Sequence, residues 1–115
     1  DVAFHILGYH DLYHTTNGWD IDKASFLKQL ASSIKKGGQL VIVDHSAVEG
    51  SKTIHSQDLH RIDKQYVIDE LKGYGFNLTI DSDLLSNDKD TRMISPFKSE
   101  MRRKTDRFVL VFEKE

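Results

Sequence analysis

The sequence predicts an α/β fold. Two short apolar runs, Val2–Leu7 and Leu40–Val43, have the length and composition of buried strands. A segment with helical spacing of its apolar residues separates them, so the three pieces together form a βαβ unit. The two strands of this unit are therefore expected to be parallel neighbours in one sheet.

The first strand is expected over residues 2–7, buried on both faces, and it ends at Gly8. A polar and aromatic loop follows over residues 9–19. The second strand is expected over residues 39–44 and ends on an acidic residue. Both predicted strands therefore lead into polar side chains at their carboxyl ends.

The helix between these strands is expected to begin at Asp20 or Asp22, since either carboxylate can accept hydrogen bonds from the first free amides. Lys35 and Lys36 are expected at its C-terminal end, where cations suit the helix dipole. Gly37 then allows the left-handed conformation that stops a helix. The apolar residues at helical spacing are Phe26, Leu27, Leu30, Ala31 and Ile34.

A second helix is expected after a polar connection, with Asp63 as its N-cap and its end at Gly73 or Gly75. The next run alternates apolar and polar residues over 77–82. Such alternation is typical of a strand with one exposed face, so we expect this strand near an edge of the sheet.

The last part of the chain is a long connection over residues 83–106 and a final buried strand over 107–113. The connection is long by ordinary loop statistics. Within it, Ser95 and Pro96 favour a short helical turn.

Composition limits the possible functions. The chain has 115 residues, of which 38% are hydrophobic and 30% are charged, and this predicts one soluble globular unit. A net charge of -2 argues against a nucleic-acid binder, and no apolar run is long enough for a membrane span. The absence of cysteine excludes disulfides, cysteine zinc sites and a thiol nucleophile. We expect a cytoplasmic protein that binds neither nucleic acid nor membrane.

Several segments resemble one family when taken in order: GYHDLYH, IKKGGQLVIVDH, VDHSAVEGS, HRIDKQYVIDELKGYGF, ELKGYGFNLTIDSDLL and RRKTDRFVLVFEK. Together they resemble the second half of a class I methyltransferase that uses S-adenosylmethionine. More narrowly, they are similar to a bacterial group of predicted methyltransferases of undefined substrate. The resemblance spans essentially all of the chain. It implies a partial Rossmann-like sheet, from the fourth strand of that family onward, with the last strand antiparallel between the strands at 39–44 and 77–82.

The first half of that family has no counterpart in this sequence. In that family, the first half carries a glycine-rich cofactor loop after a strand and an acid that holds the ribose. The glycine pair of this sequence, Gly37-Gly38, instead follows a helix and precedes a strand, which is the wrong context for such a loop. The chain also begins at Asp1 without a methionine. We therefore interpret residues 1–115 as a C-terminal half, completed by a missing N-terminal half or by a second copy along the first strand. Alone, it is expected neither to bind the cofactor appreciably nor to turn over.

The candidate site lies where the first two strands end. The carboxyl ends of adjacent parallel strands meet at one crevice, where ligands of open α/β sheets bind. The resemblance assigns Asp44 and His45 to the side that faces a small-molecule substrate. It assigns to the border of S-adenosylmethionine the residues Leu7, Gly8, Tyr9 and His10. Since imidazole titrates near neutrality, His10 or His45 is the candidate base that removes a proton from the acceptor.

Two further residues, His60 and Arg61, precede the second helix and are expected to reach over the same crevice as substrate-binding residues. The guanidinium of Arg61 suits an anionic group of a substrate. Its alternative is a surface ion pair with Asp58 or Asp63.

Other side chains have a functional and a structural interpretation. Tyr9, Tyr13 and Trp19 either form the floor of an aromatic pocket or cover the edge of the core. The turn before the last strand is either a motif on the substrate side or a structural turn, which Thr105 and Asp106 fix.

Three functions are compatible with these features. The first is methyl transfer from S-adenosylmethionine to an unidentified small acceptor. The second is a non-catalytic interaction module that pairs through the open edge of Val2–Leu7. The third is a metal-binding protein that uses His10, His14 and His45, although the spacing of the histidines sets no third ligand and we assign no metal on sequence grounds.

Overall fold

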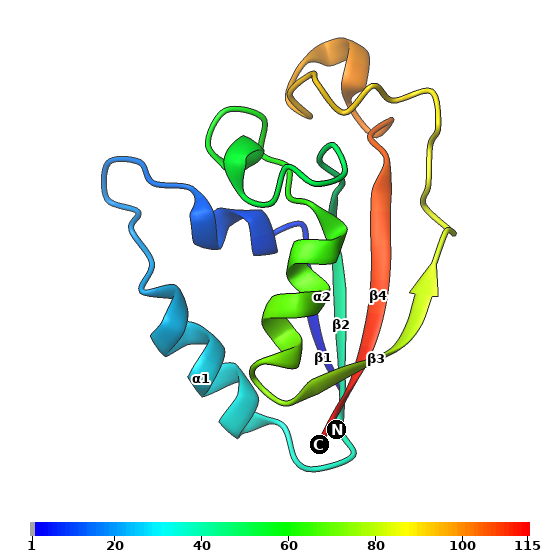
Figure 1. Cartoon of the computed structure of the whole chain (residues 1–115). Helices are drawn as coiled ribbons and strands as arrows, with labels where there is room; N and C mark the ends of the chain where they lie inside the picture. Colours follow the sequence, from blue (N-terminus) through cyan, green and yellow to red (C-terminus); the bar gives the residue numbers. More distant parts are fainter. Residues whose placement is uncertain (1) are drawn as a thin grey trace.

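The computed structural model describes residues 2–115, and Asp1 lies outside the described residues. It contains four strands and two α-helices, with short 3-10 helices in the connections (Figure 1). In chain order the main elements are β1 (Val2–Ile6), α1 (Lys23–Ser33), β2 (Gln39–His45), α2 (Lys64–Lys72), β3 (Phe76–Ser82) and β4 (Arg107–Lys114).

The four strands form one mixed sheet in the order β1-β2-β4-β3. β1 and β2 are parallel, which confirms the predicted βαβ unit. β4 is antiparallel to both of its neighbours and lies between β2 and β3, as expected from the resemblance. β3 is an edge strand, and a register shift interrupts its pairing with β4 between Leu78 and Ile80.

The core lies on one face of the sheet. The register pairs Leu40 with Phe112 and Ile42 with Leu110, and side chains paired in this way point to the same face. All four are fully buried, and they belong to one apolar cluster with Leu27 of α1 and with α2. The residues that α2 adds to this cluster are Val67 and Leu71.

The opposite face of the sheet is open at β1, which corrects the prediction of a strand buried on both faces. Val2, Phe4 and Ile6 are 54%, 66% and 58% exposed. Phe4 and Ile6 pair with Val41 and Val43, so this apolar row continues onto β2. The alternation along β4 likewise buries one face fully and the other only in part. Apolar runs in these strands therefore predicted their existence but not their two-sided burial.

The helix ends follow from capping residues. The carboxylate of Asp22 accepts a hydrogen bond from the amide of Ser25 at 3.2 Å, and that of Asp63 accepts one from Gln65 at 3.2 Å. Both predicted N-caps are therefore confirmed. α1 ends at Ser33, earlier than predicted, so Lys35 and Lys36 lie in the following turn rather than in the helix.

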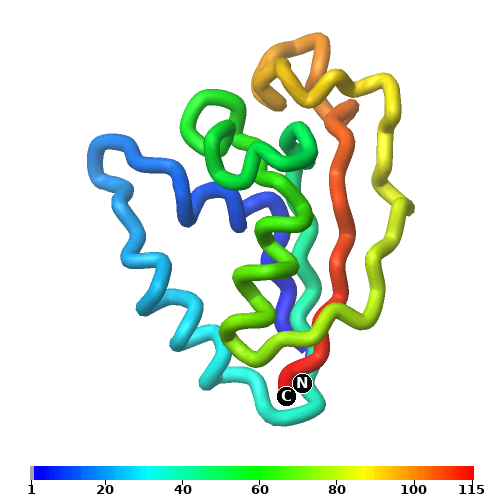
Figure 2. Tube along the Cα trace, viewed as in Figure 1, coloured from blue at the N-terminus to red at the C-terminus, as the bar shows by residue number. Residues whose placement is uncertain are grey.

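The connections that carry the candidate site gather at one end of the sheet. Figure 2 shows the loops after β1 and β2 and the loop before β4 at one end of the molecule, while the start of β1 and the end of β4 lie at the other. The helical turn expected at Ser95 and Pro96 lies slightly further on, over Ser99–Met101. No helix within residues 2–115 is long and apolar enough to cross a membrane.

Candidate functional site

A cavity of about 420 Å³ lies at the carboxyl ends of β1 and β2, where the crevice was predicted. Histidine dominates its lining, since four of the six histidines of the chain contribute to it. Apolar and aromatic side chains from two connections, the one after β1 and the one before β4, complete the wall. The residues that matter below are Leu7, His10, Asp11, His14, Trp19, His45, His60 and Phe97.

The central contact of the site joins His10 to Asp44. Nδ1 of His10 lies 2.7 Å from Oδ1 of Asp44, and the backbone amide of His10 donates to Oδ2 at 2.7 Å. The amide of His45 also donates to Asp44, which is fully buried. Because a carboxylate only accepts hydrogen bonds, it holds the proton of His10 on Nδ1 and leaves Nε2 as the second ring position.

A second carboxylate acts on the same imidazole. Nε2 of His10 lies 3.1 Å from Oδ1 of Asp11, whose side chain is 38% exposed. Burial lowers the pKa of His10, but the hydrogen bond to Asp44 and the charges of Asp44 and Asp11 outweigh it and raise that pKa above the ordinary 6.5. His10 is thus a buried imidazole whose charged form is stabilised from both ring edges.

His45 has the opposite electrostatic character. Its Nδ1 lies 2.7 Å from Oγ1 of Thr105, so a neutral hydroxyl is its side-chain partner. Burial lowers the pKa of His45 to about 4. Of the two predicted bases, His10 is therefore the stronger, and His45 is a neutral ring on the cavity wall.

His60 closes the cavity from the connection between β2 and α2. Its ring lies 4.6 Å from that of His14 and 4.8 Å from that of Phe97, measured between centroids. Burial, followed by the nearby His14 and His10, lowers the pKa of His60. Its backbone has a φ of 51°, and Leu7, which also lines the cavity, has a φ of 58°. Left-handed backbone at residues other than glycine costs about 1–3 kcal/mol, and it also occurs outside the cavity at Lys52, Arg92 and Arg103.

Of the four residues assigned to the cofactor by resemblance, two face the cavity. Leu7 and His10 line it, whereas Tyr9 is fully buried and donates its hydroxyl to Glu70 at 2.7 Å. At Gly8, a side chain would begin 2.8 Å from Nε2 of His5, so any larger residue would have to displace that imidazole beneath the loop.

The aromatic residues of the first loop likewise divide between the edge of the core and the cavity. Tyr13 also donates its hydroxyl to Glu70, and it packs edge-to-face against Tyr66. Trp19 lines the cavity, and its indole donates to the backbone oxygen of Asp11 at 3.1 Å. The core-edge interpretation therefore holds for Tyr9 and Tyr13, and the pocket interpretation holds for Trp19.

The structure places Arg61 away from the cavity and away from the surface, which corrects both sequence interpretations. Its side chain is 0% exposed and forms two hydrogen bonds, of 2.7 and 3.0 Å, with the carboxylate of Asp90. Its remaining donors bond to the backbone oxygens of Ser46 and Ile94. With every donor engaged in the interior, Arg61 presents no guanidinium to a substrate.

The turn before β4 is structural, as one of the two interpretations expected. The carboxylate of Asp106 accepts hydrogen bonds from the amide of Asn87 and from the guanidinium of Arg92. Its own amide donates to Asp90. Asp90 and Asp106 thereby fasten the long connection to β4.

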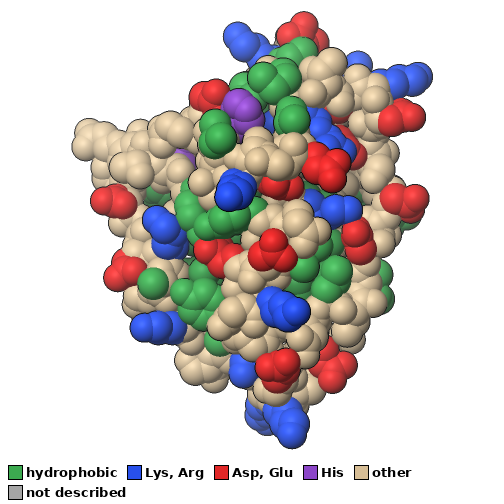
Figure 3. Space-filling view, viewed as in Figure 1, with side chains coloured by type: hydrophobic (Ala, Val, Ile, Leu, Met, Phe, Trp, Pro, Cys, Tyr) green, Lys and Arg blue, Asp and Glu red, His purple; other side chains and the backbone are tan. Residues whose placement is uncertain are grey.

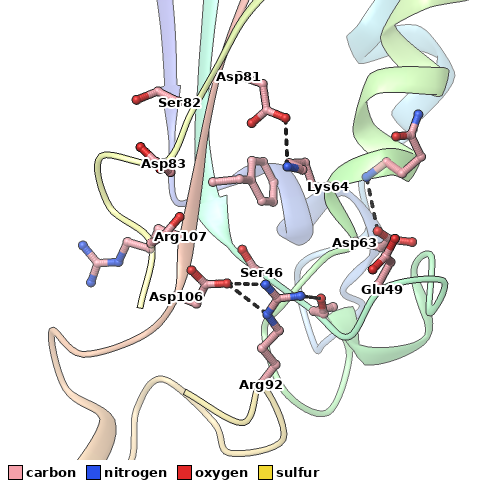
Figure 4. Close-up of a pocket in the computed structure, with 14 residues that line it drawn as sticks. Ser46, Glu49, Asp63, Lys64, Asp81, Ser82, Asp83, Arg92, Asp106 and Arg107 are labelled. Carbon is pink, nitrogen blue, oxygen red and sulfur yellow. Dashed lines mark hydrogen bonds and ion pairs between the residues drawn. The ribbon is translucent and has the colours of Figure 1, made fainter. Parts of the chain in front are cut away.

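A larger cleft of about 600 Å³ lies beside this turn, and it is less suited to chemistry. Figure 4 shows two ion pairs among its charged side chains: Lys64 binds Asp81 at 2.9 Å, and Arg92 binds Asp106 at 2.6 Å. Asp63, on the same wall, caps α2. Four of its charged side chains are thus paired with one another, whereas several imidazoles meet in the smaller cavity, which is the better candidate site.

Basic and acidic side chains are interspersed on the face drawn in Figure 3. A histidine side chain reaches the surface among hydrophobic groups near the upper end of the same face.

Sequence reasoning missed three contributors to the site. Thr105 lies 60 residues from His45, and Phe97 comes from the long connection that has no regular pattern. Asp11 follows His10 directly in the sequence, but adjacency alone does not bring its carboxylate to the imidazole, and only the structure shows that contact.

Comparison of the chain with protein-family models, with curated proteins and with solved structures found no match. The function is therefore argued from the topology and the site.

Proposed function

We propose that these residues form the C-terminal half of a class I methyltransferase domain, which transfers a methyl group from S-adenosylmethionine to a small acceptor. The observation that carries the proposal is the cavity at the carboxyl ends of the parallel pair β1 and β2. The sheet order, with β4 antiparallel between β2 and β3, supports it, because the resemblance implies the same arrangement.

The lining of the cavity suits part of such a cofactor. When bound, S-adenosylmethionine supplies a methyl group that is already activated by a positively charged sulfur. Leu7 offers apolar contact, and aromatic faces such as those of Trp19 and Phe97 attract cations. The glycine-rich loop and the ribose-binding acid are not among these residues, so we expect the chain alone to hold the cofactor weakly.

His10 is the residue that we assign as the base. A methyl transfer needs an aligned acceptor and, for a hydroxyl or amine, a group that takes its proton. Asp44 orients the ring through Nδ1, and Nε2 is the nitrogen left for the acceptor. The imidazolium that forms is stabilised by Asp44 on one side and by Asp11 on the other. His45, Trp19 and Phe97 then shape the pocket for the acceptor.

Amide chemical-shift mapping with S-adenosylhomocysteine, the demethylated product, tests the proposal. We expect changes confined to the Leu7–His10 segment and to the other cavity residues, without saturation at millimolar ligand. Changes centred on the cleft around Asp63, or none near β1, would overturn the assignment. Tight binding of S-adenosylhomocysteine in a calorimetric titration would contradict the proposal that most cofactor contacts belong to an N-terminal half.

Two exposed phenylalanines give a matched control for this titration. Phe97 is 77% exposed and lines the cavity, whereas Phe4 is 66% exposed on the open face of the sheet. Phe97→Ala should reduce the shift changes, and Phe4→Ala should leave them unaltered. Equal effects of both variants would show that the ligand binds exposed aromatic groups without using the cavity.

A second candidate function is pairing with a second copy through β1. This edge strand carries no Lys, Asp or Glu, whereas the other edge, β3, has a register shift and Asp81. Charges and irregularities of the kind seen in β3 protect edges from pairing, and β1 lacks them. Sedimentation should then show a dimer that Phe4→Lys disrupts and that Leu84→Lys, at an 80% exposed loop position, does not. A monomeric wild-type chain would refute this candidate.

A further inference from the structure

The histidine cavity contains a ligand set suited to a transition metal. We propose that it binds one divalent cation of the zinc type through His10, Asp11 and His60. One potential ligand atom from each of these residues lies within 4.8 Å of the other two. The site does not depend on methyl transfer, and it would serve a protein of another activity equally well.

One distance between the ligand atoms is close to that of a bound metal, and the others are at most 4.8 Å. Zinc binds nitrogen and oxygen at about 2.0–2.1 Å in a tetrahedron, so its ligand atoms lie about 3.3 Å apart. Nε2 of His10 and Oδ1 of Asp11 are already 3.1 Å apart. The ring of His60 is only partly buried, and a shift of about 1–2 Å by rotation about its side-chain bonds would complete the set.

Asp44, which contacts the other nitrogen of the His10 ring, also suits a metal site. Asp44 accepts the Nδ1 proton of His10 and is itself fully buried with further hydrogen bonds from two backbone amides. In metal sites, a carboxylate in this position fixes the tautomer of the ligating histidine, orients its ring and makes the other nitrogen a better ligand. Asp44 is therefore a positioning residue for the metal.

The charges of His10 and Asp11 also favour a cation between them. With its proton on Nδ1, a neutral His10 directs the lone pair of Nε2 at the carboxylate of Asp11, and the two repel unless a proton or a metal lies between them. Two imidazole nitrogens with one carboxylate are typical ligands of zinc and its neighbours, and not of magnesium or calcium.

The cavity leaves room for a further ligand. Three protein ligands with an open fourth position are typical of zinc sites that bind water or substrate. A cation at this position lowers the pKa of a bound water or hydroxyl. A bound metal would occupy Nε2 of His10, so this imidazole could no longer take the proton of the acceptor. The metal would instead favour the deprotonated acceptor by lowering its pKa.

Calorimetric titration of the chelator-treated 115-residue chain with zinc chloride tests the site. We expect one equivalent to bind, and we expect His60→Ala and Asp11→Asn each to weaken the affinity at least tenfold. His55→Ala is the matched control, because His55 pairs with the exposed Asp58 outside the cavity and should leave the affinity unchanged. Circular dichroism of each variant confirms that it is folded.

Cobalt substitution provides a second readout. The tetrahedral ligand-field absorption of Co²⁺ should appear in the wild-type chain and in His55→Ala, and it should be lost in His60→Ala. Three results would overturn the proposal: no stoichiometric zinc in the wild type, unaltered affinity in both His60→Ala and Asp11→Asn, or an equal loss in His55→Ala.

Discussion

Replacing Asp90 by asparagine should destabilise the protein more than a change at any exposed acidic residue of the same connection. Each oxygen of Asp90 accepts two hydrogen bonds, one from the guanidinium of Arg61 and one from a backbone amide. The amide group of asparagine would set an NH₂ against two of these donors, and the buried cation of Arg61 would lose its counter-charge.

The magnitude follows from the burial of the pair. The side chains of Arg61 and Asp90 are both 0% exposed. Breaking such a buried pair by removing one partner costs about 3–5 kcal/mol, a large share of the roughly 5–15 kcal/mol that stabilises an ordinary domain. With an m-value of about 2 kcal/mol/M, the urea midpoint should fall by roughly 2 M.

Urea unfolding followed by circular dichroism measures this loss. Asp88→Asn is the matched control, because Asp88 is exposed on the same connection, and it should change the free energy of unfolding by less than about 0.5 kcal/mol. A loss below about 1 kcal/mol for Asp90→Asn, the range of exposed ion pairs, would refute the buried geometry of Arg61.

Two further predictions concern stability. Burial raises the pKa of Asp90, but its hydrogen bonds from Arg61 and from two backbone amides outweigh this and hold that pKa below its ordinary 3.8. The contribution of ionised Asp90 to stability is therefore fully present above the pKa of this group in the unfolded chain. The difference in unfolding free energy between wild type and Asp90→Asn should close as the pH falls below about 4. A difference that stays constant down to pH 2 would contradict this. Asp63→Ala should cost about 1–2 kcal/mol in urea unfolding, because its carboxylate caps α2 and also accepts hydrogen bonds from the amides of Gly50 and Lys52. Asp69→Ala, within the exposed part of α2, should cost less, and an equal cost would argue against the capping role.

Much of the fold could be predicted because its signals are local. The apolar runs, the N-cap at Asp63 and the glycine at position 37, which has a φ of 83°, depend on neighbouring residues in the sequence. The exposure of Phe4 could not be predicted, since an apolar run indicates a strand but does not say how many faces are covered.

The site was predictable in part for the same reason. The topology of a βαβ unit is sufficient to bring His10 and Asp44 together, because both stand where a parallel strand ends. The partners of Arg61 and of His45 were not predictable. Asp90 and Thr105 lie on an irregular connection whose path is determined by tertiary hydrogen bonds and has no periodic signal.

The central claim is that Asp44 holds the proton of His10 on Nδ1 and leaves Nε2, which lies beside Asp11, to accept a proton or bind a metal. Long-range nitrogen–proton NMR correlations of the imidazole rings, recorded at alkaline pH where the rings are neutral, test it most directly. The Nδ1–H tautomer is predicted for His10, because the carboxylate of Asp44 accepts from that nitrogen. Finding the Nε2–H tautomer at His10 would contradict the claim, and with it both the proposed base and the proposed metal ligand.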